Sequence, residues 1–198
     1  MGRRSEMEMI KTFIEIGTSD FDTCLDLVNK GDWIGVMCEP SPPYYDSIKE
    51  KIDGSFYGKN VHLEKVAISD YNGKTAFTVS KNDGPDWVRG ISCITAPHHK
   101  GERMFDKKEN QQYIDQHIEV DCMTLNTLVA KYDFPHINYL KIDTEGHELN
   151  ILESYDWSIK PDLIRVEHSH VDDIYLSNLL KDQGYTTYIE QFDVYGIR

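Results

Sequence analysis

The sequence predicts an α/β protein with one mostly parallel β-sheet and helices packed against it. Short apolar segments of strand length alternate with amphipathic segments of helix length, which is the pattern of successive strand–helix–strand units. Turn-forming residues such as Gly17 and Pro40 follow the apolar segments and mark the strand ends. No repeat, low-complexity segment or linker divides the 198 residues, so we expect a single domain over residues 1–198.

The first part of the chain contains two strand–helix pairs. Residues 11–17 are a predicted strand that ends at a glycine, and residues 19–31 follow as a helix with a serine at its start. The second strand, 33–40, ends at a proline, and the next helix, 42–52, has proline in its opening turn.

The middle part is richer in strands. Residues 60–70 are predicted as a third strand, and the turn sequence YNGK leads into residues 75–80, which alternate as an exposed edge strand does. Strand character resumes at 117–125, and a short helix is predicted over 124–132.

The last part supplies the best candidate for a buried central strand, residues 137–143. A helix over 147–154, a strand over 161–168 and a helix over 172–184 follow it. Residues 185–198 contain two short strand patterns, which predict a terminal antiparallel pair.

Residues 81–112 form a long segment with little periodicity, and a loop of this length in a compact domain is usually functional or mobile. Aromatic rings and charged hydrogen-bonding groups commonly hold ligands, so Trp87, Arg89, His98 and His99 are candidate substrate-binding residues. The loop could also act as a lid that excludes water. The alternative is a surface loop without a ligand role.

Composition excludes several classes of protein. The formal net charge is −13, which repels a phosphate backbone and disfavours nucleic-acid binding. No apolar run approaches the ~20 residues that span a bilayer, and no apolar signal core follows the basic N-terminus. The four cysteines lack a paired short spacing, so we expect free thiols rather than metal or redox ligands. A cytoplasmic, soluble protein is the expectation.

Polar and acidic residues gather at the predicted carboxyl ends of the strands, where ligands bind in open α/β sheets. The first turn, EIGTSDFD, lacks the G-x-G-x-x-G pattern that brings backbone amides to a pyrophosphate, and its acids disfavour an anion. A cofactor with an ammonium and a sulfonium, S-adenosylmethionine, fits better. The candidate cofactor-binding residues are Glu15, Gly17, Thr18, Ser19, Glu39, Pro40, Ser69, Asp70 and Asp143.

These segments, in their order, resemble the FkbM family of S-adenosylmethionine-dependent methyltransferases. The resemblance covers residues 12–170. It rests on FIEIGTSDF, VMCEPSPPYYDSIKEK, VHLEKVAISDYNGKTAFTV, VDCMTLNTLV, INYLKIDTEGHELNILES and LIRVEHSH. The chain departs from the family at Ser19 and Phe21, where a second small residue or glycine is usual, which bears on how the methionine tail is held. It also lacks the leading helices of many members, so it is a minimal form or one domain of a longer protein.

The resemblance implies a Rossmann-like, doubly wound sheet of seven mostly parallel strands, with an antiparallel C-terminal strand and helices on both faces. It also implies methyl transfer from S-adenosylmethionine to the oxygen of a small-molecule or glycan acceptor, because FkbM-like enzymes are associated with O-methylation of natural products and sugars. Nothing in the sequence indicates an oligomeric state, and neither nucleic-acid nor membrane partners are expected.

An alcohol is a weak acid, so its methylation needs a base or a metal ion. Asp143, Glu167 and His168 stand at neighbouring strand tips and are candidate ligands for Mg²⁺ or Mn²⁺, similar to catechol-type O-methyltransferases. Asp143 is also a candidate catalytic residue. Without a metal, Glu145 or His147 would be the general base, with His147 better matched by its ordinary pKa.

Two other functions remain open at this point. A nicotinamide-dependent oxidoreductase would use the same kind of sheet, although the phosphate-binding glycines are missing. A noncatalytic nucleotide-binding module that has kept the fold is the second alternative, and the presence of Glu39, Asp143, Glu145 and Gly146 argues against it.

Overall fold

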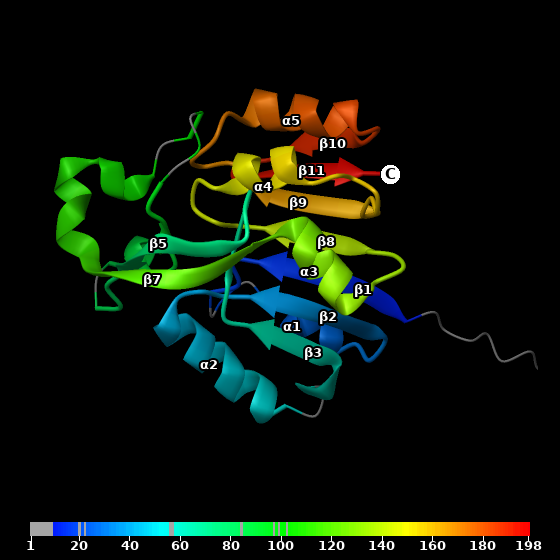
Figure 1. Ribbon diagram of the computed structural model, residues 1–198, viewed down its shortest axis with the longest axis horizontal. Coiled ribbons are helices and arrows are strands. Elements are labelled where there is room, and N and C mark those ends of the chain that lie inside the picture. Colours follow the sequence, from blue (N-terminus) through cyan, green and yellow to red (C-terminus); the bar gives the residue numbers. More distant parts are fainter. Residues whose placement is uncertain are drawn as a thin grey trace, which may run out of the picture.

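The computed structural model describes residues 10–19, 21, 23–55, 58–83, 85–96, 98, 100–101 and 103–198. Its main element is a seven-stranded sheet in the order β10-β11-β9-β8-β1-β2-β3 (Figure 1). The strands are β1 (Lys11–Ile16), β2 (Trp33–Cys38), β3 (Val61–Glu64), β8 (Tyr139–Ile142), β9 (Leu163–Glu167), β10 (Thr186–Ile189) and β11 (Asp193–Ile197). β11 runs antiparallel to the other six strands, which are all parallel to one another. The predicted doubly wound, mostly parallel sheet is therefore confirmed.

Side-chain alternation along β1 and β2 explains why helices cover both faces of this sheet. Ile14 and Val36 point into a core formed with α3 (Leu125–Tyr132), α4 (Glu148–Ser154) and α5 (Asp173–Asp182). Phe13 and Met37 point to the opposite face, where they pack against α1 (Leu25–Val28) and α2 (Pro42–Asp53).

A second, four-stranded sheet in the order β4-β7-β5-β6 was not predicted from the sequence. It contains β4 (Ala67–Ser69), β5 (Gly73–Ser80), β6 (Cys93–Ile94) and β7 (Ile114–Thr124). The parallel strands β1, β2 and β8 point their carboxyl ends toward β5 and β7 (Figure 1). This arrangement leaves the strand ends facing a second layer rather than open solvent.

Three predicted elements differ from the structure. The predicted strand 60–70 is two strands, β3 and β4, because the chain leaves the large sheet at Lys65 and enters the small one. The segment 75–80 lies inside the small sheet, paired with β6 and β7, rather than at an exposed edge. The predicted helix 19–31 is reduced to α1, and Ser19, at its predicted start, has a positive φ of 51°, which is not helical.

Residues 81–112 are more ordered than a plain loop. The described part contains short 3-10 turns, η2 (Asp86–Val88), η3 (Met104–Asp106) and η4 (Lys108–Tyr113), in addition to β6; a further turn, η1 (Gly58–Asn60), precedes β3. The segment has its own apolar cluster, formed by Val88, Ile91, Cys93 and Phe105. It is therefore a packed subdomain beside the strand ends.

All four cysteines lie within the described residues, are buried and form no disulfide bond. In the same part of the chain, no helix is both long enough and apolar enough to cross a bilayer.

Candidate functional site

A pocket lies where the carboxyl ends of β1, β2 and β8 meet the small sheet. The turn after β1 contributes Gly17, Thr18 and Ser19 to its walls, and the turn after β8 contributes Asp143 and Glu145. Its remaining lining includes Phe21, Glu39, Pro40, Tyr44, Phe77, Gly90, Ser92 and Ile94. The position agrees with the rule that ligands bind beyond the carboxyl ends of parallel strands.

Gly17 is required by the close approach of two strand ends. A Cβ atom at this position would lie 1.7 Å from the carbonyl oxygen of Asp143, and Gly17 has a φ of +75°. The backbone N–H of Gly17 donates to the carbonyl of Cys38 at 3.0 Å, and the N–H of Asp143 donates to Ile16 at 2.9 Å. Because Gly17 has no side chain, the turn after β1 can lie directly against the backbone of Asp143.

Glu39 organises the polar wall of the pocket. Its carboxylate accepts hydrogen bonds from the backbone N–H groups of Ser19, at 2.7 Å, and Ser41, at 2.8 Å. Each carboxylate oxygen thus accepts one of these backbone hydrogen bonds. The side-chain hydroxyls of Thr18, Ser19 and Ser41 are buried and have no hydrogen-bond partner among the described residues. Such groups are costly unless a ligand or water satisfies them, so this wall fits a polar ligand.

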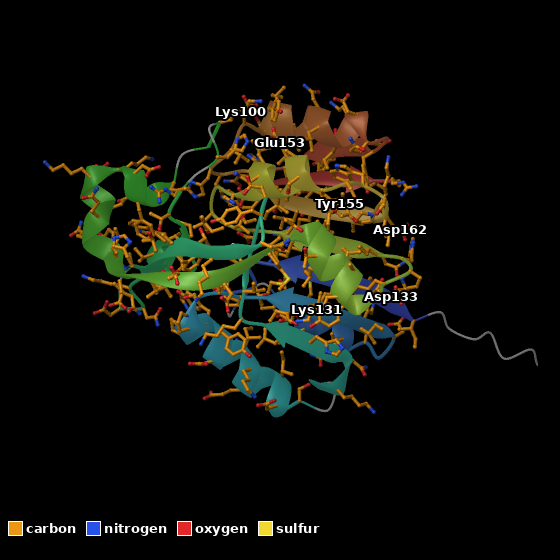
Figure 2. The ribbon with its side chains drawn as sticks, viewed as in Figure 1. Lys100, Lys131, Asp133, Glu153, Tyr155 and Asp162 are labelled. Atoms are coloured by element: carbon orange, nitrogen blue, oxygen red, sulfur yellow. The ribbon has the colours of Figure 1, made fainter. Side chains whose placement is uncertain are left out.

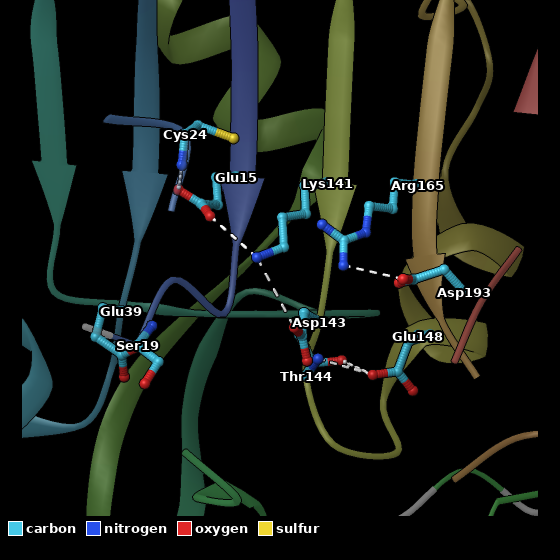
Figure 3. A network of polar contacts seen from close by, with 10 residues as sticks. All are labelled: Glu15, Ser19, Cys24, Glu39, Lys141, Asp143, Thr144, Glu148, Arg165 and Asp193. Atoms are coloured by element: carbon cyan, nitrogen blue, oxygen red, sulfur yellow. Dashed lines mark hydrogen bonds and ion pairs between the residues drawn. The ribbon is translucent and has the colours of Figure 1, made fainter. Parts of the chain in front are cut away.

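Glu15, predicted to bind the cofactor, lies behind the pocket rather than in its lining. It is fully buried, accepts the backbone N–H of Cys24 at 3.0 Å, and lies 3.3 Å from the ammonium of Lys141. Lys141 is in turn 3.9 Å from Asp143, so a chain of charges joins β1 to the turn after β8 (Figure 3). Glu15 thus braces the β1 turn and offsets the buried charge of Lys141.

The turn after β8 is held by Glu148, which the sequence indicated only as a favourable charge in the first turn of a helix. Glu148 is fully buried and accepts hydrogen bonds from the backbone N–H and hydroxyl of Thr144, at 2.7 and 2.8 Å (Figure 3). It also accepts the N–H of Gly146 at 3.1 Å. Burial raises the pKa of Glu148 despite these bonds. In the sequence, Glu148 stands four residues after Thr144, and this spacing is the signal that could have indicated the role.

Asp143 projects into the pocket, where its side chain is 31% exposed. Burial of the Asp143 carboxyl, followed by the negative charge of Glu145, raises its pKa to about 7. A carboxylate with this pKa is a much stronger base than an ordinary aspartate and is still substantially ionised at neutral pH.

Glu145 makes an ion pair that the sequence did not predict. Its carboxylate lies 2.8 Å from Nε2 of His170, which follows β9. Burial alone would lower the pKa of His170, but the hydrogen bond and charge of Glu145 raise it to about 9. Glu145 also has a positive φ of 59°, which is strained for a residue with a Cβ and is typical of functional turns. In the sequence, His170 stands two residues after His168, close enough to the same strand end to indicate this contact.

The predicted metal set of Asp143, Glu167 and His168 is not brought together. Glu167 and His168 are consecutive at the end of an extended strand, so their side chains lie on opposite faces of the sheet. Nε2 of His168 lies 2.9 Å from the carbonyl oxygen of Glu190, in the loop between β10 and β11. Burial and the charge of Glu145 raise the pKa of Glu167 to about 9. No group of three His, Cys, Asp or Glu residues in the described ranges is arranged to hold a metal ion.

His147, Ser69 and Asp70 lie together but outside the pocket lining. Nε2 of His147 is 3.0 Å from the hydroxyl of Ser69, which is in turn 2.9 Å from Asp70. Burial lowers the pKa of His147 to about 4, so the ring is neutral at physiological pH and a weak base. The contact ties the start of α4 to the end of β4. This geometry favours a structural role for all three residues over base catalysis or adenine binding.

The four substrate residues predicted in the 81–112 segment are dispersed. Trp87 is 45% exposed and packs edge-on against Tyr113. The guanidinium of Arg89 lies 5.6 Å from the ring of Phe21, at the mouth of the pocket. His98 is buried, with Nε2 3.0 Å from Glu153 on α4; His99 lies outside the described residues. The same segment supplies the pocket with Gly90, Ser92 and Ile94 instead.

Comparison with solved structures supports the fold. The methyltransferase FkbM from Methylobacillus flagellatus KT matches with a TM-score of 0.62 at 14% sequence identity, over 96% of this chain and 44% of that one. The precorrin-6y C5,15-methyltransferase from Geobacter metallireducens GS-15 matches with a TM-score of 0.49 at 14% identity, over 96% of this chain and 79% of that one. The chain thus spans less than half of the FkbM structure.

No curated protein sequence matches the chain. A family model described as the methyltransferase FkbM domain matches residues 14–187, which includes every strand end that lines the pocket. The resemblance seen in the sequence motifs is therefore confirmed: the chain belongs to the FkbM methyltransferase family.

Proposed function

We propose that the protein is an S-adenosylmethionine-dependent O-methyltransferase that acts on a hydroxyl of a sugar, glycan or glycosylated metabolite. The observation that carries this proposal is the charge of the pocket: three carboxylates, Glu39, Asp143 and Glu145, line it beside the unpartnered hydroxyls of Thr18 and Ser19. Such a lining attracts a cation and offers hydrogen-bond partners to ribose and ammonium groups.

The lining fits S-adenosylmethionine better than a dinucleotide. In this proposal Glu39 accepts hydrogen bonds from the ribose and the turn at Thr18 and Ser19 holds the methionine end, because all three residues line the pocket. When bound, the cofactor supplies an electrophilic methyl group on a sulfonium. A pyrophosphate would instead meet the carboxylates of Asp143 and Glu145 with no second glycine to open the backbone toward it.

Asp143 is the general base of the proposed reaction. Its raised pKa of about 7 suits it to take the proton of an alcohol as the oxygen becomes nucleophilic. Glu145, fixed by His170 at 2.8 Å, positions the acceptor and keeps the local charge negative beside Asp143. Carboxylates that accept hydroxyl hydrogen bonds, together with the rings of Phe21 and Phe77 in the wall, suit a sugar, which has polar edges and apolar faces.

Cofactor binding tests the proposal most directly. We expect titration calorimetry to detect S-adenosylmethionine binding, and Glu39→Ala to weaken it about 10- to 100-fold because two charge-assisted ribose contacts are lost. Asp26 is an exposed acid on α1 outside this pocket. Asp26→Ala is therefore the matched control and should bind S-adenosylmethionine as the parent does.

Binding of a nicotinamide dinucleotide in place of S-adenosylmethionine would favour the oxidoreductase alternative. Binding of neither would leave a noncatalytic module as the better interpretation. Transfer of labelled methyl groups to a panel of glycans then identifies the acceptor.

Chelation separates the base mechanism from a metal mechanism. Because His168 is turned to the carbonyl of Glu190 and away from Glu167, we expect methyl transfer to be unchanged in excess chelator. Loss of activity in chelator, restored by Mg²⁺ or Mn²⁺, would show that Asp143 acts through a bound ion.

A further inference from the structure

A second pocket lies beside the first, and the ionisable residues that line it are basic. Lys100, Arg103 and Lys107 line it from the 81–112 segment, and Ser169 and His170 line it from the loop after β9. In a chain with a net charge of −13, this grouping of cationic side chains around one hollow is exceptional. We call this hollow the basic pocket.

Asp106 and Glu153 lie near these cations but do not neutralise all of their positive charge. Asp106 pairs with the guanidinium of Arg103, but an arginine has five N–H donors, and this pair uses two. Lys107 has no ion-pair partner among the described residues. Lys100 is at the rim, with its ammonium 3.2 Å from the centre of the Tyr175 ring, on the side of the molecule where Glu153 also lies (Figure 2).

The basic pocket is joined to the methyl-transfer pocket through one ion pair. His170 lines the basic pocket and Glu145 lines the other, and their side chains are 2.8 Å apart. The segment that carries the cations is docked firmly at this point. A Cβ atom on Gly101 would lie 3.0 Å from the carbonyl oxygen of His170 and 3.3 Å from that of Gly146. This contact places the backbone between Lys100 and Arg103 against the loop after β9.

We propose that the basic pocket binds an anionic oxyacid group, phosphate or carboxylate, of the acceptor whose hydroxyl is methylated. The acceptor spans the Glu145–His170 pair, with its hydroxyl near Asp143 and its anionic group near Arg103 and Lys107. Arginine and lysine recognise phosphate and carboxylate through charge-assisted hydrogen bonds, which supports this assignment. The inference deepens the proposed function and depends on it for the identity of the hydroxyl, but not for anion binding.

Anion binding is measured first, without cofactor, by phosphorus NMR titration with inorganic phosphate at constant ionic strength. We expect Lys107→Gln to weaken binding about tenfold, as the loss of one charge-assisted hydrogen bond predicts. Asp106→Asn should tighten it about threefold, because it removes the competing charge while its amide oxygen still accepts the N–H of Arg103. Lys108→Gln, the neighbouring lysine outside the pocket lining, should bind phosphate as the parent does.

Glucose 6-phosphate, glucuronate and glucose then distinguish the source of the anion in a competition against inorganic phosphate. Competition by either anionic sugar but not by glucose supports the inference and identifies phosphate or carboxylate. Equal competition by glucose, or phosphate binding that is the same in Lys107→Gln and Lys108→Gln, overturns it. Anion binding with the expected variant effects but no methyl transfer to any acceptor would support the basic pocket and contradict the proposed function.

Discussion

Asp143→Asn is expected to lower kcat/KM for methyl transfer by about 10³-fold, within the range for loss of a general base. The asparagine keeps the shape of the side chain and its place in the pocket but cannot take a proton. Binding of S-adenosylmethionine should fall much less, because Glu39 and the turn at Thr18 and Ser19 are unchanged. Initial rates at saturating cofactor, compared with calorimetric binding, measure the two effects separately.

The pH dependence gives the same residue a second test. Because the base must be ionised and the pKa of Asp143 is raised to about 7, kcat/KM should rise with pH up to about pH 7 and level above it. The effect on stability has the opposite sign. Because the pKa of this carboxyl is higher in the folded state than in the unfolded chain, Asp143 makes the fold less stable as the pH rises from the unfolded-state pKa toward 7. Asp143→Asn should therefore unfold at no lower denaturant concentration than the parent at pH 8.

Asp26→Asn is the matched control for Asp143→Asn. Asp26 is an exposed acid on α1 and does not line the pocket, so this variant should keep the parental rate and pH profile. Parental turnover in Asp143→Asn, or a profile without an ionisation near pH 7, would remove Asp143 from the base role.

Much of the fold could be predicted from the sequence because the signals were local. The strands of the large sheet carry apolar segments closed by turn residues, and helices α2 to α5 have clear amphipathic patterns. The strand-end residues Gly17, Glu39 and Asp143 followed from the rule on parallel sheets, and all three line the pocket.

The parts that could not be predicted depend on contacts between distant segments. The small sheet pairs β4 with β7, which are far apart in the sequence, so no local pattern indicates it. The ion pair of Glu145 and His170 forms only because β8 and β9 are neighbours and both loops turn the same way. His168 does not join this group, because side chains alternate along an extended strand and His168 directly follows Glu167.

Gly17→Ala is expected to have the largest effect on folding, lowering the free energy of unfolding by about 3–5 kcal/mol. Part of the cost, about 1–2 kcal/mol, is the left-handed backbone that a residue with a Cβ must adopt. The rest arises because the new methyl would lie 1.7 Å from the carbonyl oxygen of Asp143, so the ends of β1 and β8 must separate. That movement strains the hydrogen bond from the N–H of Asp143 to the carbonyl of Ile16, and it moves the Asp143 side chain away from the turn after β1.

Gly31→Ala measures the backbone part of this effect without the steric part. Gly31 also has a positive φ, +95°, but a Cβ there would meet no atom within 4 Å. It should therefore cost only about 1–2 kcal/mol, with S-adenosylmethionine binding retained. Urea denaturation of both variants, with calorimetry on the folded fraction, makes the comparison. Equal destabilisation would mean that backbone conformation alone explains the glycine. A larger loss in Gly17→Ala, accompanied by loss of cofactor binding, would show that the contact between the two strand ends builds the site.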